Sequence, residues 1–209
     1  MALTKEKNFG GDNGMIPWIN FGILITSSVV FTIFYVKSVR PAALERRIGS
    51  SAYKKCTIYR LVASCSMLIA AINYILYFWF PLPINLPAVF PWPWWVSALI
   101  ALCIAVPSLF LMIKGAKDAG AETMTPKREH EMYGGIYEKI RHPQAVGEFP
   151  LWWVIAFLVN SPFLIMFSFV YLPIWYYFCI AEENDLNIRY GKAYEEYCKK
   201  VGFWIPRRN

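Results

Sequence analysis

The sequence predicts an all-α integral membrane protein with about five transmembrane helices and a cytoplasmic C-terminal amphipathic helical segment. Of its 209 residues, 57% are hydrophobic and only 17% are charged, whereas about 25% of an ordinary soluble domain is charged. Several apolar runs reach or approach the roughly 20 residues that a helix needs to cross a hydrocarbon core about 30 Å thick. Basic residues gather in alternate connections between these runs, which is typical of multi-pass membrane proteins.

Three long apolar runs form the first part of the chain, and each is long enough to cross a bilayer. They cover residues 16–36, 58–80 and 92–113. Residues 1–113 are therefore predicted to be a region of three transmembrane spans, in which we expect little chemistry. Asn73, in the middle of the second run, is interpreted as a helix-packing residue, because polar side chains often join helices in membranes.

The second part of the chain, residues 114–209, holds most of the polar side chains that could react. Its two apolar runs, 146–159 and 163–181, are joined by Asn160-Ser161-Pro162, which predicts a transmembrane helical hairpin over about 143–181. The first run of the pair is short and carries Glu148, so we expect it to be partly buried in protein. Beyond Glu182, apolar residues recur at helical spacing and predict an amphipathic tail helix.

The distribution of basic residues predicts the orientation of the chain. Six Lys and Arg residues lie between the first two spans, six between the third and fourth, and six in the tail. The Pro-rich connection at 81–91 carries no charge. Because basic loops remain on the cytoplasmic side, we expect the N-terminus outside, with the C-terminus and the candidate active site in the cytoplasm.

Charge and cysteine content argue against two other kinds of partner. The net charge of +7 is spread over several loops rather than forming one stripe, so we expect no nucleic-acid partner. The five cysteines form no Cys-x-x-Cys pair, so we interpret them as packing residues and expect no metal. The lipid bilayer is the expected surrounding of the chain.

Two charged clusters flank the predicted hairpin at matched distances from its turn. His142 lies nineteen positions before Ser161, and Glu182 lies twenty-one positions after it. Antiparallel helices bring residues equidistant from their turn to the same level. We therefore predict that Arg141-His142-Pro143 and Glu182-Glu183 meet at one membrane surface.

This combination of groups suits a zwitterionic ligand. Pro143 favours the first turn of a helix, where free N–H groups attract an anion. Glu182 and Glu183 would then face the ligand's cationic groups. A plain interfacial ion-pair network is the alternative interpretation, although exposed ion pairs contribute only about 0 to 1 kcal/mol to stability.

Taken in order, the residues of the last third resemble the isoprenylcysteine carboxyl methyltransferases and the related phospholipid methyltransferases. An isolated Arg-His-Pro would be weak evidence, whereas an ordered set at the family's spacing, over about the last 80 residues, is specific. The matching set comprises Gly135-Ile136-Tyr137, Arg141-His142-Pro143, Gly147, Glu182-Glu183, Leu186, Tyr190-Gly191, Tyr194, Tyr197, Val201 and Pro206.

The resemblance implies a membrane enzyme that binds S-adenosyl-L-methionine in a cytoplasmic pocket and releases S-adenosyl-L-homocysteine. It implies four catalytic residues that position the reactants rather than act as acid or base: Arg141, His142, Glu182 and Glu183. It also implies a larger set of cofactor-binding residues: Glu122, Glu129, His130, Glu131, Met132, Tyr137, His142, Pro143, Gln144, Ala145 and Glu182.

The chain departs from the family's usual pattern at several positions. The family usually has His at position 129, aliphatic residues at 131 and 132, and Tyr at 145. Where prenylcysteine enzymes place an Arg that holds the substrate carboxylate, this chain has Phe178. The adenosine contacts would then rely more on backbone groups. The presence of Phe178 in place of the arginine leaves the identity of the substrate open.

The preferred functional hypothesis is methyl esterification of the C-terminal carboxylate of an isoprenylated cysteine, or of a similar lipid-linked carboxylate on a small molecule or protein. The first alternative is a phospholipid N-methyltransferase. The second is a membrane reductase, since some sterol reductases share a similar C-terminal half. The third is a non-catalytic membrane scaffold.

Overall fold

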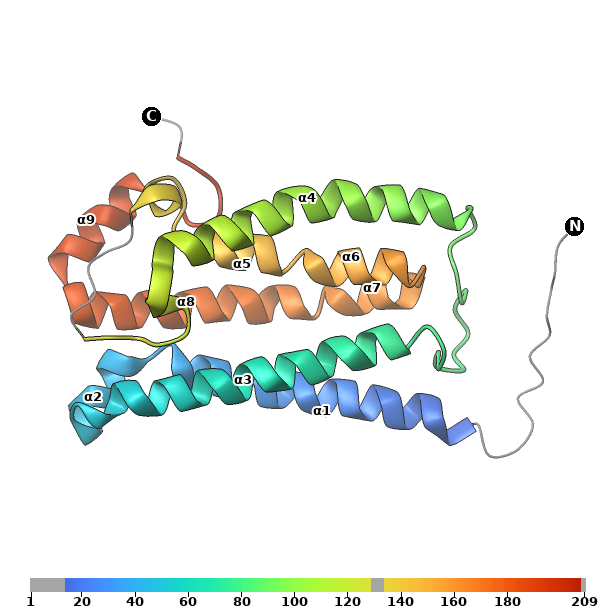
Figure 1. Cartoon of the computed structure of the whole chain (residues 1–209), viewed down its shortest axis with the longest axis horizontal. Coiled ribbons are helices and arrows are strands. Elements are labelled where there is room, and N and C mark those ends of the chain that lie inside the picture. The colour runs from blue at the N-terminus through green and yellow to red at the C-terminus, as the bar shows by residue number, and fades with distance from the viewer. Residues whose placement is uncertain (1–13, 129–133, 208–209) are drawn as a thin grey trace, which may run out of the picture.

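The computed structural model describes residues 14–128 and 134–207, and over these residues the fold is entirely helical, without a strand. In Figure 1, α1 and α3 lie side by side below the α5–α8 layer, and α4 runs along the opposite side of that layer. The predicted all-α fold is confirmed. The elements are α1 (Met15–Ser38), α2 (Pro41–Ile48), α3 (Ser51–Leu76), α4 (Trp94–Ala119), η2 (Gly120–Thr123), η3 (Gly135–Glu138), α5 (Pro143–Glu148), α6 (Leu151–Leu158), α7 (Pro162–Ser168), α8 (Tyr171–Tyr190) and α9 (Lys192–Lys200).

Four helical segments of the described chain are long and apolar enough to cross a membrane. They match the predicted spans at 16–36, 58–80, 92–113 and 163–181, and comprise Met15–Ser38, Ser51–Leu76, Trp94–Thr123 and Pro162–Tyr190. Their outer surfaces expose large apolar side chains such as Leu61, Val106 and Phe110. Apolar surface of this extent marks contact with a membrane rather than with water.

The predicted run at 146–159 does not form one continuous helix. It is divided between α5, which ends at Glu148, and α6, which begins at Leu151. Pro150 lies at the break, and proline lacks the N–H group that a continuous helix requires. Trp152 and Ala156 of α6 are buried, so this short segment is partly enclosed by protein, as expected.

The hairpin turn forms where the sequence predicts it. Asn160 adopts a left-handed conformation with φ of 58°, which asparagine tolerates better than most residues. The Ser161 hydroxyl accepts a hydrogen bond from the backbone N–H of Leu164 at 3.3 Å, and Pro162 occupies the first turn of α7. A capped start of this kind fixes the direction in which α7 and α8 return along α6.

Backbones of α4 and α5 approach each other closely at Gly147. A Cβ atom at this position would lie 2.5 Å from the backbone nitrogen of Met112 and would also collide with the carbonyl oxygen of Ser108. Only glycine permits this approach. The contact fixes the distance between α4 and the helix start that carries His142.

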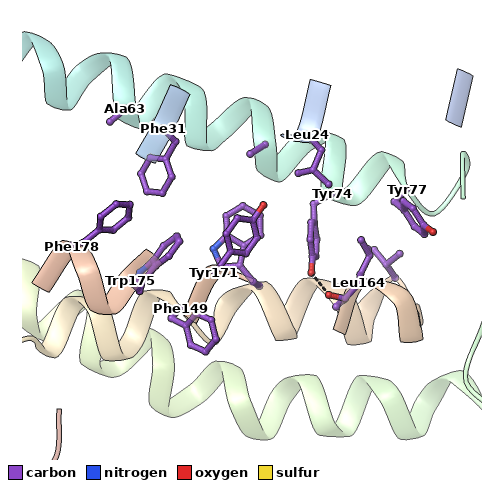
Figure 2. Close-up of a cluster of buried hydrophobic side chains, with 14 of the residues drawn as sticks. Leu24, Phe31, Ala63, Tyr74, Tyr77, Phe149, Leu164, Tyr171, Trp175 and Phe178 are labelled. Carbon is purple, nitrogen blue, oxygen red and sulfur yellow. Dashed lines mark hydrogen bonds between the residues drawn. The ribbon is translucent and has the colours of Figure 1, made fainter. Parts of the chain in front are cut away.

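An aromatic core joins the α1–α3 pair to the hairpin. Figure 2 shows Tyr74, Tyr171, Trp175 and Phe178 in the space between the helices. The Tyr74 hydroxyl donates a hydrogen bond to the carbonyl of Leu164 at 2.5 Å. Buried tyrosines usually have such a partner, so the core combines apolar packing with satisfied polar groups.

Short helices gather at one end of the bundle, where α2, α9, η2 and η3 lie (Figure 1). Asp185 of α8 caps α2 by accepting hydrogen bonds from the backbone N–H groups of Ala42 and Ala43, at 3.0 and 2.8 Å. A carboxylate at a helix N-terminus is favourable. The cap therefore ties the connection between α1 and α3 to the end of α8.

Candidate functional site

The two charged clusters of the hairpin meet at this end of the bundle. The His142 imidazole lies between two carboxylates, with Nδ1 3.4 Å from Glu182 Oε2 and Nε2 3.0 Å from Glu183 Oε1. Arg141 Nε lies 3.1 Å from the same Glu183 oxygen. The predicted meeting of these clusters is confirmed by the three distances.

Local backbone structure holds Arg141 and His142 at the start of α5. Pro143 occupies the first turn of the helix, so His142 is the N-cap residue. The C-terminal tail runs beside the residue that precedes Arg141, because Ile140 and Gly202 form an isolated parallel β-bridge. Within this bridge, the Arg141 N–H donates a hydrogen bond to the carbonyl of Gly202 at 2.9 Å. Phe203 then packs against the His142 ring at 4.8 Å and beneath the Arg141 guanidinium at 5.2 Å.

The His142 imidazole is buried, with only 4% of the residue exposed. Burial by itself lowers the pKa of an imidazole, but contacts with Cys179, Glu182 and Glu183 outweigh it and raise the pKa of His142 well above its ordinary value of 6.5. Opposite charges within a few ångströms favour the charged form. The two carboxylates therefore favour the charged imidazolium form of His142.

A pocket opens beside this cluster and is called the site pocket below. Its wall contains both charged or polar residues and aromatic residues. The lining residues are Tyr35, Arg60, Ala119, Glu122, Thr123, Tyr137, Arg141, His142, Gln144, Ala145, Glu148, Trp175, Phe178, Cys179 and Glu182.

Most of the residues proposed from the sequence lie on the wall of the site pocket. Two do not: Pro143 supports the helix start, and Glu183 lies behind His142 and Arg141. A further group falls outside the described residues, namely Glu129, His130, Glu131 and Met132. The structure therefore brings together Glu122, Tyr137, Arg141, His142, Gln144, Ala145, Phe178 and Glu182.

Glu122 is held on η2 by a buried ion pair. Its Oε1 lies 2.7 Å from Arg189 Nη1, and both side chains are 6% exposed. Its Oε2 accepts a hydrogen bond from the backbone N–H of Lys127 at 3.0 Å. A buried carboxylate needs such partners, and the ion pair connects η2 to α8.

Tyr137 and Gln144 form the polar side of the pocket near α5. Gln144 Nε2 donates a hydrogen bond to the Tyr137 hydroxyl at 2.8 Å, and the Tyr197 hydroxyl donates to the Tyr137 carbonyl at 2.6 Å. Burial raises the pKa of the Tyr137 phenol. Tyr137 therefore remains protonated and able to donate a hydrogen bond.

Phe178 belongs to the aromatic wall. Its ring lies 4.5 Å from that of Tyr35 and 5.5 Å from that of Trp175, and the residue is 4% exposed. A guanidinium at this position would have to displace the packed rings. The aromatic residue thus replaces a charged contact with an apolar surface.

The structure adds pocket residues that the sequence analysis missed. Tyr35 and Arg60 come from the first three spans, where little chemistry was expected. Arg60 Nη1 donates hydrogen bonds to the backbone carbonyls of Glu122 and Thr123, at 2.7 and 2.8 Å. The available signal was a charged residue inside a predicted span, because such residues are costly in a membrane and usually functional.

Fold and site together define a multi-pass helical membrane protein with a charged pocket at one end of its bundle. Residues 94–193 match the model of the phospholipid methyltransferase family. The match covers a little under half of the chain, from the start of α4 into α9, and includes most of the site pocket. It confirms the resemblance to this group of membrane methyltransferases. Comparisons with curated proteins and with solved structures give no match.

Proposed function

We propose that the protein is an S-adenosylmethionine-dependent methyltransferase of the membrane that acts on a lipid-linked acceptor. The observation that carries the proposal is the imidazole of His142 beside Glu182 on the wall of the site pocket, within the region that matches the family. Exposed ion pairs add little stability. A buried charged cluster in a pocket is therefore better explained by ligand binding.

The side chains of the pocket fit the chemistry of this cofactor. Glu122 and Glu182 offer carboxylates to an amine or ribose, Tyr137 and Gln144 offer hydrogen bonds, and aromatic rings line the remaining wall. Glu129, His130, Glu131 and Met132 are proposed to complete the adenosine contacts. When bound, the cofactor would supply an electrophilic methyl group on a sulfonium.

The chain's own residues would act by positioning. A carboxylate acceptor is ionised near neutral pH, so no strong base is required. Arg141 and His142 would orient the reactants, Glu182 would hold the cationic side of the cofactor, and Glu183 would fix His142. Holding two reactants in line is worth up to roughly 7 to 11 kcal/mol, and the aromatic wall would exclude water.

The acceptor proposed first is the carboxylate of a C-terminal isoprenylated cysteine or a similar lipid-linked carboxylate. A phospholipid amine is the second candidate, and two observations favour it. Phe178 replaces the arginine that would hold a carboxylate, and Glu148 adds a further carboxylate to the pocket. A carboxylate attracts an ammonium group and repels another carboxylate.

The basic residues of the chain support a cytoplasmic location for the site. On this basis we propose that the N-terminus is outside and that the C-terminus lies in the cytoplasm with the pocket. Labelling of single cysteines introduced near Gly14 and Arg207, with a membrane-impermeant thiol reagent, tests the orientation. Labelling of the Arg207 position in intact cells would contradict it.

Calorimetric titration of the purified protein with S-adenosylhomocysteine tests the cofactor assignment independently of turnover. Saturable binding is expected, and it should be lost in Glu182→Gln. Absence of binding at millimolar ligand would contradict the proposal and favour a scaffold, whereas binding of a nicotinamide cofactor instead would favour a reductase.

The acceptor is identified from the product. Incubation with radiolabelled methyl donor and either a farnesylated cysteine or phosphatidylethanolamine is followed by base treatment. A methyl ester releases its label as methanol in base, whereas an N-methyl group retains it. Base-stable label on the phospholipid alone would replace the first acceptor with the second.

A further inference from the structure

A second pocket lies where α1, α2 and α3 meet, apart from the site pocket. It is called the α2 pocket and is lined by Lys37, Arg40, Ala43, Leu44, Arg47 and Tyr59. Three of these six residues are basic and none is acidic. Among the described residues, no ion pair involves any of the three cations.

Some of the other arginines at this end of the bundle have carboxylate partners. Arg128 lies 3.3 Å from Glu45 Oε1, and Arg189 lies 2.7 Å from Glu122 Oε1. Glu45 belongs to α2, yet it lines a neighbouring pocket together with Arg46 and Arg128. The two faces of α2 therefore differ: the neighbouring pocket contains the carboxylate of Glu45, whereas the charged residues of the α2 pocket are all positive.

Aromatic rings lie close to Lys37 of the α2 pocket and to a further cation, Lys55. The Lys37 ammonium lies 5.5 Å from the Phe34 ring and 5.9 Å from the Tyr59 ring, and the Lys55 ammonium lies 6.0 Å from Tyr59. The two ammonium groups beside Tyr59 repel each other. An anion bound between them would remove that repulsion.

Exposed apolar side chains lie near the α2 pocket on the helices that come before and after α2 in the chain. Lys37 lies in the last turn of α1, and Ile33, one turn before it, is 47% exposed. On α3, Ile58 and Leu61 are 52% and 57% exposed. Acyl chains can therefore lie along α1 and α3 while a headgroup reaches the cations at their ends.

We propose that the α2 pocket binds the phosphate of an anionic phospholipid in the leaflet at this end of the bundle. Arg40 and Arg47 would contact phosphate oxygens from the two ends of α2. Guanidinium groups bind phosphate strongly and often through two hydrogen bonds. Lys37 would add a point charge where the headgroup joins the acyl chains. This site does not depend on the methyltransferase assignment.

Two adjacent arginines provide a matched test. Arg46 and Arg47 both lie in the last turn of α2 and are both exposed, but only Arg47 lines the α2 pocket. Arg47→Gln and Arg46→Gln remove the same charge from the same helix turn. Because both side chains are exposed, neither substitution should prevent folding.

The full-length protein in detergent is titrated with dioleoyl phosphatidic acid, dioleoyl phosphatidylcholine or inorganic phosphate, and bound molecules are counted by native mass spectrometry. Phosphatidic acid should bind more tightly than phosphatidylcholine. Arg47→Gln should weaken phosphatidic acid binding about fivefold, which corresponds to roughly 1 kcal/mol per basic residue near anionic lipid. Arg46→Gln should change it less than about twofold.

Three results would overturn the proposal. If Arg46→Gln and Arg47→Gln weakened phosphatidic acid binding equally, the binding would depend on general surface charge and not on the α2 pocket. Equal affinity for phosphatidic acid and phosphatidylcholine would remove the need for an anionic headgroup. Inorganic phosphate that binds as tightly as phosphatidic acid, with the same sensitivity to Arg47→Gln, would assign the pocket to a soluble anion.

Discussion

The imidazole Nε2 of His142 lies 3.0 Å from Glu183 Oε1, although 41 positions separate the two residues in the chain. The contact closes the hairpin at its open end, opposite the turn at Asn160. It also leaves the other ring nitrogen 3.4 Å from Glu182, whose side chain lines the site pocket. Glu183 thus orients the ring that meets the proposed ligand site.

Removal of the Glu182 charge should reduce turnover more than stability. Glu182→Gln keeps the size of the side chain but loses the carboxylate beside His142. A loss of positioning should lower methyl transfer on the order of 100-fold or more, measured as the initial rate with labelled methyl donor. Glu196→Gln is the control, because Glu196 is exposed and pairs only with Lys199 among the described ion pairs. A wild-type rate in Glu182→Gln would mean that the site is misplaced.

Protonation of His142 should make stability depend on pH. The pKa of the folded-state imidazole is raised well above 6.5, so its stabilising contribution is fully present below about pH 6.5. It should be lost as the pH rises through the folded-state pKa. Thermal unfolding in detergent, measured from about pH 6 to pH 10, should show wild type losing its advantage over His142→Gln. A constant difference across this range would exclude a charged His142.

The close approach at Gly147 should tolerate no side chain. In Gly147→Ala, the added Cβ meets backbone atoms of α4 that cannot rotate away, so a loss of roughly 1 to 3 kcal/mol in unfolding free energy is expected. Gly22→Ala is the matched control, because a Cβ there has no neighbour within 4 Å. Alanine favours helix over glycine, so the control should be neutral or slightly stabilising. Equal stability of the two variants would refute this packing.

The buried ion pair between Glu122 and Arg189 should be coupled. Arg189→Gln removes a partner of a carboxylate that is 6% exposed, and breaking a buried pair typically costs roughly 3 to 5 kcal/mol. Glu122→Gln combined with Arg189→Gln should recover part of this loss, because no unpaired charge is left. A double-mutant cycle of unfolding free energies measures the coupling. Strictly additive effects would show that the two groups act independently.

Periodic and compositional features of the sequence predicted much of the fold. Four of the predicted runs correspond to long apolar helices, and the turn at Asn160-Ser161-Pro162 lies where predicted. The break at Pro150 was not predicted. Proline does occur within membrane helices, as Pro107 does within α4, so its presence alone does not indicate where a helix ends.

The candidate site was predicted less completely than the fold. The distances of His142, Glu182 and Glu183 from the hairpin turn were sufficient to predict that these residues meet, because residues equally far from the turn of two antiparallel helices lie at the same level. Arg60 and Tyr35 could not be placed in this way. Their contribution to the pocket depends on how the α1–α3 pair packs against the hairpin, and no local spacing records that arrangement.

The sequence by itself determined that this chain is a helical membrane protein and that its charges gather at one end of a hairpin. These properties follow from the length of apolar runs and the constant rise of a helix, which act locally. Only the tertiary structure decided which carboxylate faces the pocket and which lies behind His142. That choice depends on helix rotation and on contacts between distant segments, such as Phe203 with His142, which no local pattern specifies.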